Sequence, residues 1–220
     1  ATVISALTNA PATNINFYLI LGMTIEGYII DATNNPVSTS IEFGRLDGTN
    51  WLSLWWWGSG SHGDYSCTIG ATSNLLMRIT DGRFHEVYFS NKLSAVSADT
   101  LSGDPGVILS NVNFKLYDPS ADSDHDGLRD YIEGYVTGTD PFNSNDCLRC
   151  TGIQSSNKLV TLTWASVSGK FYGIERSTNL LSGSAWTNLV PLPVMAVGSK
   201  ASLMDSNMPP CSVYRVFINY

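Results

Sequence analysis

The stretch DSDHDGLRDYIE, residues 122–133, lies between two parts of the chain that read very differently from it. It places four aspartates and one glutamate within twelve positions. Carboxylates held at roughly 4 Å from each other repel by about 1 to 4 kcal/mol per pair, depending on the local dielectric. Something must offset this repulsion. It is either a cation, which serves catalysis, signalling or structure, or the solvent around an acidic surface loop.

The acidic residues follow the spacing D-x-[DN]-x-[DN]-G-x5-E of a calcium-binding loop. Alternate side chains of a tight loop point inward, and Gly127 supplies the sharp turn. Ca²⁺ accepts about six to eight oxygen ligands in a flexible shell, so it suits this set better than Mg²⁺. Asp130 binds directly or through water in this pattern. The predicted ligands are Asp122, Asp124, Asp126, the Leu128 carbonyl, Asp130 and Glu133.

The sequence around the loop does not fit a calcium switch. Sensor loops lie between two helices that open when the ion binds. Here the strand-like NVNFKLYD (111–118) and Pro119 precede the loop, and only LRDYIEGYV (128–136) predicts a helix, of about two turns, closed by Gly138 and Pro141. We therefore expect a structural ion that stiffens a short linker.

Nearly all the remaining sequence predicts strands and turns, because alternating apolar and β-branched residues are separated by Gly, Asn and Pro. The predicted fold class is all-β, with two β-sandwich domains joined by a calcium-binding loop and helix. The predicted boundaries are 1–21 for an N-terminal strand segment, 22–118, 119–146 and 147–220. The strands expected in the first sandwich are 24–31, 38–46, 65–70, 74–81, 84–90 and 111–118.

Composition limits the classes of function. The net charge of -7 and pI near 4.7 argue against nucleic-acid partners and anionic membrane surfaces. No apolar run is long enough to cross a bilayer, so membrane insertion is not expected. Low charge and four cysteines favour an extracellular protein, and a start at Ala1 is expected of a mature secreted chain or a proteolytic piece.

Three segments resemble known families. DSDHDGLRDYIEGYVTGTDPFNSND (122–146) resembles the thrombospondin type 3-like calcium repeats of bacterial secreted proteins, which implies a structural Ca²⁺ site. Residues 22–118, with IEGYIIDATNNPVSTSIEF and GDYSCTI, resemble a carboxypeptidase regulatory-like, transthyretin-type domain, a non-catalytic family often found in tandem. Residues 148–220, with LTWASVSGKFYGIERSTNL and VYRVFINY, are similar to fibronectin type III or immunoglobulin-like domains of bacterial surface proteins.

The N-terminal segment echoes a later strand. ATNINFYLILG (12–22) repeats the pattern of LSNVNFKLYD (109–118). Two strands share the pattern by chance, or residues 1–20 are the final strand of a sandwich whose other strands lie outside this chain. The tandem arrangement of the regulatory-like family favours the second interpretation. The predicted assembly contacts, which would enter the edge of a neighbouring sheet, in trans or in cis, are Ile15, Phe17 and Leu19.

No residue pattern predicts catalysis. His62 lies near Ser59 and Asp64, but a G-x-S-x-G elbow in a strand–turn–helix setting is missing. No glycine-rich phosphate loop precedes a helix. We therefore do not expect an enzyme.

The aromatic run WLSLWWW (51–57) has two interpretations. In the first, Trp55 and Trp57 point into the core while Trp56 faces outward and contacts a protein partner. In the second, the row forms a platform on which sugar rings stack, because aromatic faces combine apolar area with a polar tip.

Cysteine spacing favours a disulfide over a metal site. CLRC (147–150) lacks the second pair or the histidines of a zinc site. We expect Cys147 and Cys150 in the first strand of the second sandwich, and one disulfide among Cys147, Cys150 and Cys211. Cys67 is then free or bonded elsewhere.

These patterns together predict a non-enzymatic, secreted structural protein of bacterial type, stiffened by Ca²⁺. Copies of it are expected to assemble into an extracellular fibre or surface array by strand donation. The alternative is a carbohydrate- or protein-binding accessory module of a larger secreted or surface protein.

Overall fold

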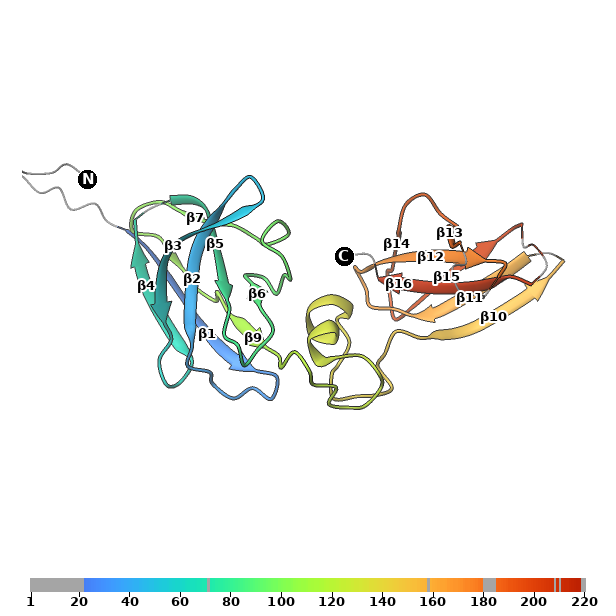
Figure 1. Cartoon of the computed structure of the whole chain (residues 1–220), viewed down its shortest axis with the longest axis horizontal. Coiled ribbons are helices and arrows are strands. Elements are labelled where there is room, and N and C mark those ends of the chain that lie inside the picture. Colours follow the sequence, from blue (N-terminus) through green and yellow to red (C-terminus); the bar gives the residue numbers. More distant parts are fainter. Residues whose placement is uncertain are drawn as a thin grey trace, which may run out of the picture.

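A computed structural model describes residues 22–70, 72–157, 159–179, 185–207, 209 and 211–218. The predicted assembly residues Ile15, Phe17 and Leu19 lie outside the described residues. Within the described ranges the all-β fold class is confirmed. Strands β1–β9 and β10–β16 form two groups along the chain, and one short helix lies between them (Figure 1).

The first group consists of two sheets that face each other across a core. One sheet has the order β4-β1-β8, with β9 also paired to β1, and the other has the order β3-β2-β5-β6, with β7 paired to β5. The bounds are β1 Met23–Asp31, β2 Ser40–Asp47, β3 Asn50–Gly58, β4 Asp64–Ile69, β5 Thr72–Ile79, β6 Val87–Tyr88, β7 Leu101–Gly103, β8 Ile108–Leu109 and β9 Phe114–Leu116.

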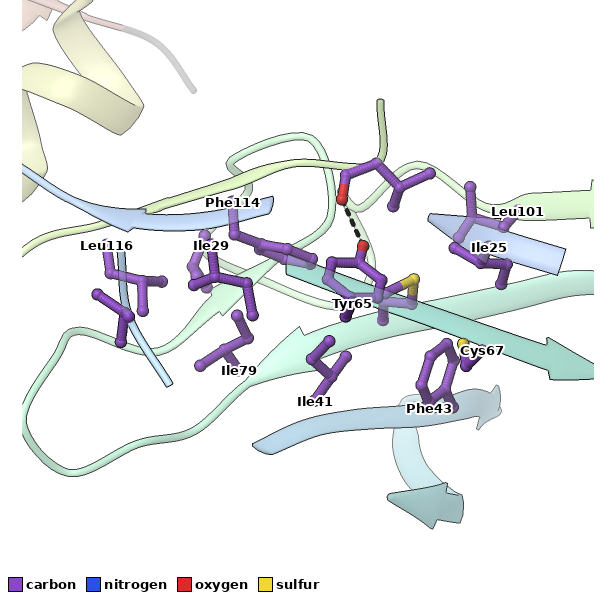
Figure 2. Close-up of a cluster of buried hydrophobic side chains, with 14 of the residues drawn as sticks. Ile25, Ile29, Ile41, Phe43, Tyr65, Cys67, Ile79, Leu101, Phe114 and Leu116 are labelled. Atoms are coloured by element: carbon purple, nitrogen blue, oxygen red, sulfur yellow. Dashed lines mark hydrogen bonds between the residues drawn. The ribbon is translucent and has the colours of Figure 1, made fainter. Parts of the chain in front are cut away.

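Alternation along the strands builds the core of this sandwich. In β1 the side chains of Ile25 and Ile29 are fully buried, and Gly27 between them is also buried, whereas Glu26 is half-buried and Tyr28 is exposed. Figure 2 shows these two residues on the same core as Ile41 of β2. The hydroxyl of Tyr65 reaches into this core and donates to the carbonyl of Val112. Each apolar side chain of this size contributes about 1.5 to 3 kcal/mol when buried.

Two expected strands of the first sandwich are much shorter than predicted, and residues 111–118 contain only β9, Phe114–Leu116. Residues 84–90 contain only β6, Val87–Tyr88. The Asp81 carboxylate accepts from the Arg83 backbone N–H at 3.0 Å, and the Phe84 N–H donates to the Asp81 carbonyl at 2.9 Å. The chain therefore turns where the sequence predicts extended backbone.

The second group also forms two facing sheets. Their orders are β10-β11-β15 and β13-β12-β14, with β16 paired to β12. The fully buried Trp164, Tyr172 and Ile174 lie at the centre of this core. The bounds are β10 Cys150–Ser156, β11 Leu159–Ala165, β12 Phe171–Ser177, β13 Thr187–Asn188, β14 Val194–Met195, β15 Lys200–Asp205 and β16 Val213–Ile218.

The linker helix is wound differently from the α-helix expected at 128–136. It begins at Asp130, and its main part is a π-helix over Ile132–Thr137. Gly138 ends it, as predicted, with a left-handed φ of 75° and an N–H that donates to the Glu133 carbonyl at 2.7 Å. π-turns are rare and are frequently found at functional sites. None of the described helical segments is long and apolar enough to cross a bilayer.

Candidate metal centre at the junction of the two sandwiches

The acidic loop folds back on itself through one oxygen of each aspartate. Asp122 accepts from the Gly127 N–H at 3.2 Å, Asp124 from the Asp126 N–H at 3.1 Å, and Asp126 from the Leu128 N–H at 2.8 Å. Gly127 has a φ of 97°, the conformation for which glycine was expected there. These bonds leave the second oxygen of each aspartate directed into the loop.

Four carboxylate oxygens of this segment are buried without a hydrogen-bond partner. They are Asp122 Oδ1, Asp124 Oδ2, Asp126 Oδ2 and Glu133 Oε2. One oxygen from each of the three aspartates lies within 4.8 Å of the others. Buried polar atoms nearly always have partners, and an unpaired buried charge is costly. The four oxygens fit a hard divalent cation, which prefers carboxylate ligands.

Glu133 carries the strongest electrostatic signal of the site. Its side chain is 0% exposed, and Oε1 accepts from the Thr139 hydroxyl at 2.9 Å. Burial, and after it the charges of Asp126, Asp124 and Asp130, raise the pKa of Glu133 to about 7, although the Thr139 hydrogen bond acts in the opposite direction. A bound cation would remove this penalty by pairing with the carboxylate.

Asp130 and Leu128 differ in role from the other predicted ligands. Both Asp130 oxygens accept from Ser123, at 2.7 Å from its N–H and 2.6 Å from its hydroxyl. Asp130 thus closes the loop across its width, and only the other four carboxylates have an oxygen free to contact an ion. Leu128 lies half-buried directly after Gly127.

The helix after the loop is fixed to the first sandwich by two tyrosines. The Tyr135 hydroxyl donates to the Lys115 carbonyl at 2.7 Å, next to β9. Tyr117 packs edge-on against Tyr135, with ring centroids 4.9 Å apart. Its ring also lies over Gly134, where an added Cβ would come within 2.3 Å of the ring. Glycine is therefore required at position 134 for this close approach.

The second sandwich reaches the same helix through Lys170. Its Nζ donates to the Val136 carbonyl at 2.6 Å, which satisfies one of the unpaired carbonyls at the helix C-terminus. Burial, with a smaller effect of Lys92, lowers the pKa of Lys170. A cavity of about 500 Å³ lies beside this contact, between the two sandwiches. The helix that follows the loop thus touches both domains.

The disulfide expected among the cysteines is not formed, and all four cysteines are free. Cys147 lies in the linker, before the first strand of the second sandwich, contrary to expectation. Its thiol donates to the Ser144 carbonyl, and its pKa is raised by burial first and then by the charge of Asp126. Cys150 begins β10, whereas Cys211 precedes β16 in the other sheet.

The tryptophan run forms β3, an edge strand of the first sandwich. Trp55 stacks on Phe43 with ring centroids 5.4 Å apart, so it packs on the core. Trp56 is 54% exposed, and Trp57 is 44% exposed rather than inward-facing as expected. A β-bulge in the pairing of β3 with β2, at Leu54, locally changes the register. An edge position leaves the side chains of β3 uncovered on one flank.

A polar cluster beside these tryptophans was not predicted from the sequence. Glu42 is 1% exposed and accepts from Trp51 Nε1 at 2.8 Å and from Arg78 Nε at 2.6 Å. The Arg78 guanidinium also lies 4.4 Å from the centre of the Trp51 ring. Burial alone would raise the pKa of Glu42, but the hydrogen bonds from Arg78 and Trp51 leave it below its usual range. The sequence offers one indication of this cluster: Glu42 lies between Ile41 and Phe43, two core residues of β2.

Comparisons with known proteins do not place the chain in a family. No family model matches it, and no curated protein matches it. One similar solved structure, from Bacteroides uniformis, is described as a "putative carbohydrate binding protein"; it is 12% identical, with a TM-score of 0.32, over 84% of this chain and 79% of that one. DUF3823 family proteins from B. uniformis and B. ovatus have TM-scores of 0.31 and 0.25 and identities of 13% and 12%, and cover 89% and 90% of this chain and 88% and 90% of theirs. Because these TM-scores are below 0.5, we draw no argument from them.

Proposed function

We propose that the chain is a non-enzymatic structural unit of an extracellular bacterial protein, in which Ca²⁺ fixes the orientation of two β-sandwiches. One observation carries this proposal: oxygens of Asp122, Asp124 and Asp126 lie within 4.8 Å of one another, and they and Glu133 Oε2 are buried without partners beside the helix that contacts both sandwiches. Asp122, Asp124, Asp126 and Glu133 would hold the ion. The ion would supply positive charge to the loop and so stabilise the joint.

The rigid joint suits a unit that is repeated along a fibre or a surface array. Copies would join end to end by donating the segment of residues 1–21 to a neighbouring sheet, which adds backbone hydrogen bonds and alternate side chains. A contact of this kind is heterologous and generates a filament when it does not close into a ring.

Calcium titration tests the metal part of this proposal. Calcium sites of extracellular modules have a Kd of roughly 10⁻⁴ to 10⁻³ M. At about 10 mM CaCl₂ such a site stabilises the folded chain by about 1.4 to 2.7 kcal/mol. We expect thermal unfolding to shift upward in CaCl₂ relative to EGTA, and much less in MgCl₂. Identical unfolding curves in CaCl₂ and EGTA would refute the calcium site and, with it, the proposal that Ca²⁺ fixes the orientation of the two sandwiches.

X-ray scattering tests the structural part. With Ca²⁺ bound, the scattering should match one fixed arrangement of the two sandwiches. With EGTA, the curve should require a wider distribution of interdomain angles. A fixed arrangement in both conditions would mean that the ion does not stiffen the linker.

A second candidate function is that of an accessory module that binds carbohydrate or protein. The exposed aromatic side chains of β3, Trp56 and Trp57, favour it because such rings stack on sugars and occur at protein interfaces. Glycan-array binding by the whole chain tests this candidate. A Trp56→Ala variant should lose binding, whereas Phe142→Ala, which removes an exposed aromatic in the linker, should keep it.

A further inference from the structure

The last described strand of the second sandwich has an open edge. β16 pairs with β12 along its whole length, from Val213 opposite Ser177 to Ile218 opposite Tyr172. Within the described residues, no strand pairs with the other edge of β16. In an immunoglobulin-type sandwich the sheet that contains the third and sixth strands carries a further strand beside the sixth. In this sandwich β12 is the third strand, and the short strands β13 and β14 pair one after the other with the same edge of β12. Counted as one interrupted strand, they put β16 in the sixth place, and the further place beside it is open.

The open edge leaves the core of this sandwich partly uncovered. Tyr214, Val216 and Ile218 alternate along β16 and pack against the core cluster, yet all three remain only half-buried. The facing side chains of β12, Tyr172 and Ile174, are each 1% exposed. The difference between the two neighbouring strands is expected when a core strand lacks one of its two neighbours.

We propose that β16 is the acceptor edge for residues 14–21 of a second copy of this chain, which add to it as an antiparallel strand. The inference rests on the strand-donation part of the proposed function and names the surface that receives the strand. Backbone N–H and C=O groups at the open edge of β16 would bond to the donor, and its alternate side chains would cover the exposed flank of the core.

The composition of the N-terminal segment suits this position. Residues 1–21 contain no Asp, Glu, Lys or Arg, although 14% of the whole chain is charged. Ile15, Phe17 and Leu19 alternate, so an extended backbone places all three on one face. An uncharged strand with one continuous apolar face is suited to cover apolar side chains at a sheet edge.

The described chain contains a second example of the same pattern. The spacing N-x-N-F-x-L recurs at residues 111–116, where Val112, Phe114 and Leu116 are buried at 3%, 1% and 0% exposure. This stretch includes β9, which pairs with β1. The pattern therefore forms a core strand in this protein. The place beside β1 is already taken by the chain's own β9, so a second strand of this type must add to a different edge.

The position of the segment requires a second copy. Residue 21 is bonded directly to Gly22, which precedes β1. Figure 1 shows the start of β1 at the end of the first sandwich remote from the second sandwich. Consecutive Cα atoms are only about 3.8 Å apart, so residues 14–21 cannot lie beside β16 of the same chain. Donation in trans brings the first sandwich of one copy to the second sandwich of the next.

β3, an edge strand with several large exposed apolar side chains, is a poorer acceptor. Its pairing with β2 contains a register shift at Leu54. Bulges twist an edge strand and interrupt the regular row of backbone groups that a new strand needs. The pairing of β16 with β12 has no such shift over its six described pairs.

Site-specific cross-linking in the full chain tests the acceptor. A benzoylphenylalanine residue replaces Phe17, and equal amounts of ¹⁴N- and ¹⁵N-labelled chains are mixed, assembled in CaCl₂ and illuminated. We expect cross-links between differently labelled copies, from position 17 to Val213–Ile218 or to the core residues beside them. Cross-links that map to β3 or elsewhere on the first sandwich would overturn the inference while leaving assembly intact.

A charge in the donor face provides the second measurement. Phe17→Asp should lower the sedimentable polymer at least tenfold, whereas Tyr18→Asp, on the opposite face of the segment, should lower it less than twofold. Unfolding curves of both monomers show whether the fold is retained. A parent chain that stays monomeric at high concentration would also overturn the inference. Calcium-dependent stability is measured separately, so its loss would count against the metal joint and not against the acceptor edge.

Discussion

Glu133→Gln should have opposite effects on stability without and with calcium. In the calcium-free protein the pKa of Glu133 rises from an ordinary 4.5 to about 7. Each pKa unit is worth about 1.4 kcal/mol, so ionising this buried carboxyl in the folded chain costs on the order of 3 kcal/mol. Because the folded pKa is the higher one, this cost is absent below pH 4.5, grows as the pH rises toward 7, and is complete at pH 8.

Glutamine keeps the size of the side chain and its hydrogen bond to Thr139 but removes the charge. At pH 8 in EGTA, Glu133→Gln should therefore raise the free energy of unfolding by up to about 3 kcal/mol. In CaCl₂ the same variant should lose most of the calcium-induced stabilisation, because one ligand oxygen no longer carries charge. Urea denaturation at pH 5 and pH 8 measures both effects. The matched control is Glu26→Gln, where the glutamate accepts from Ser66 on the first sandwich.

The reasoning fails if Glu133→Gln destabilises the calcium-free protein at pH 8 while calcium still stabilises it as in the parent. That result would mean that the Glu133 carboxylate is balanced within the protein and is not directed at an ion.

Three other variants or reactions test the joint and the cysteines. Gly134→Ala should lower the free energy of unfolding by about 1 to 3 kcal/mol in urea denaturation, because the added methyl group meets the Tyr117 ring. Lys170→Met should widen the distribution of interdomain angles in X-ray scattering, since its hydrogen bond to the helix C-terminus is lost. Iodoacetamide at pH 8 should label the exposed Cys150 and leave Cys67 unmodified in mass spectrometry, because burial raises the pKa of Cys67 to about 11.

Each of these has its own control and contrary outcome. Gly58→Ala meets no atom within 4 Å and should be neutral, so an equal loss in both glycine variants would refute the packing argument. Lys200→Met, at an exposed position of β15, should leave the scattering unchanged. If iodoacetamide labels Cys150 and Cys211 only after reduction, the two cysteines are joined in a disulfide and the free thiols of the structure are wrong.

The sequence predicts the acidic loop well because the residues that determine its conformation are close together in the chain. The spacing of the acidic residues and the position of Gly127 determine a turn within twelve residues. The structure brings oxygens of Asp122, Asp124 and Asp126 within 4.8 Å of one another and leaves one oxygen of Glu133 buried without a partner. The alternation in β1 likewise predicts its buried face, since each residue's side is set by its own backbone.

Features that depend on distant partners were not predictable. Alternation puts Trp57 on the same side of β3 as Trp55, but Trp57 is exposed because it lies at the end of an edge strand, next to Gly58. The packing of the helix on Tyr117 needs Gly134 against the ring, and the two positions are far apart in the sequence. The cysteine spacing favours a disulfide, but a bond also needs two cysteines brought within reach by the fold, and all four are free in the structure.

The parallel pairing of β1 with β8 and β9 determines how the first sandwich carries tension. β1 enters at the end remote from the linker, and β9 leaves toward it (Figure 1). A pull along the long axis therefore slides the two strands past each other in shear. Their hydrogen bonds then share the load simultaneously, whereas the bonds of a hairpin pulled from its open end break one after another. This sandwich is thus built to resist stretching along the direction in which successive copies would be linked.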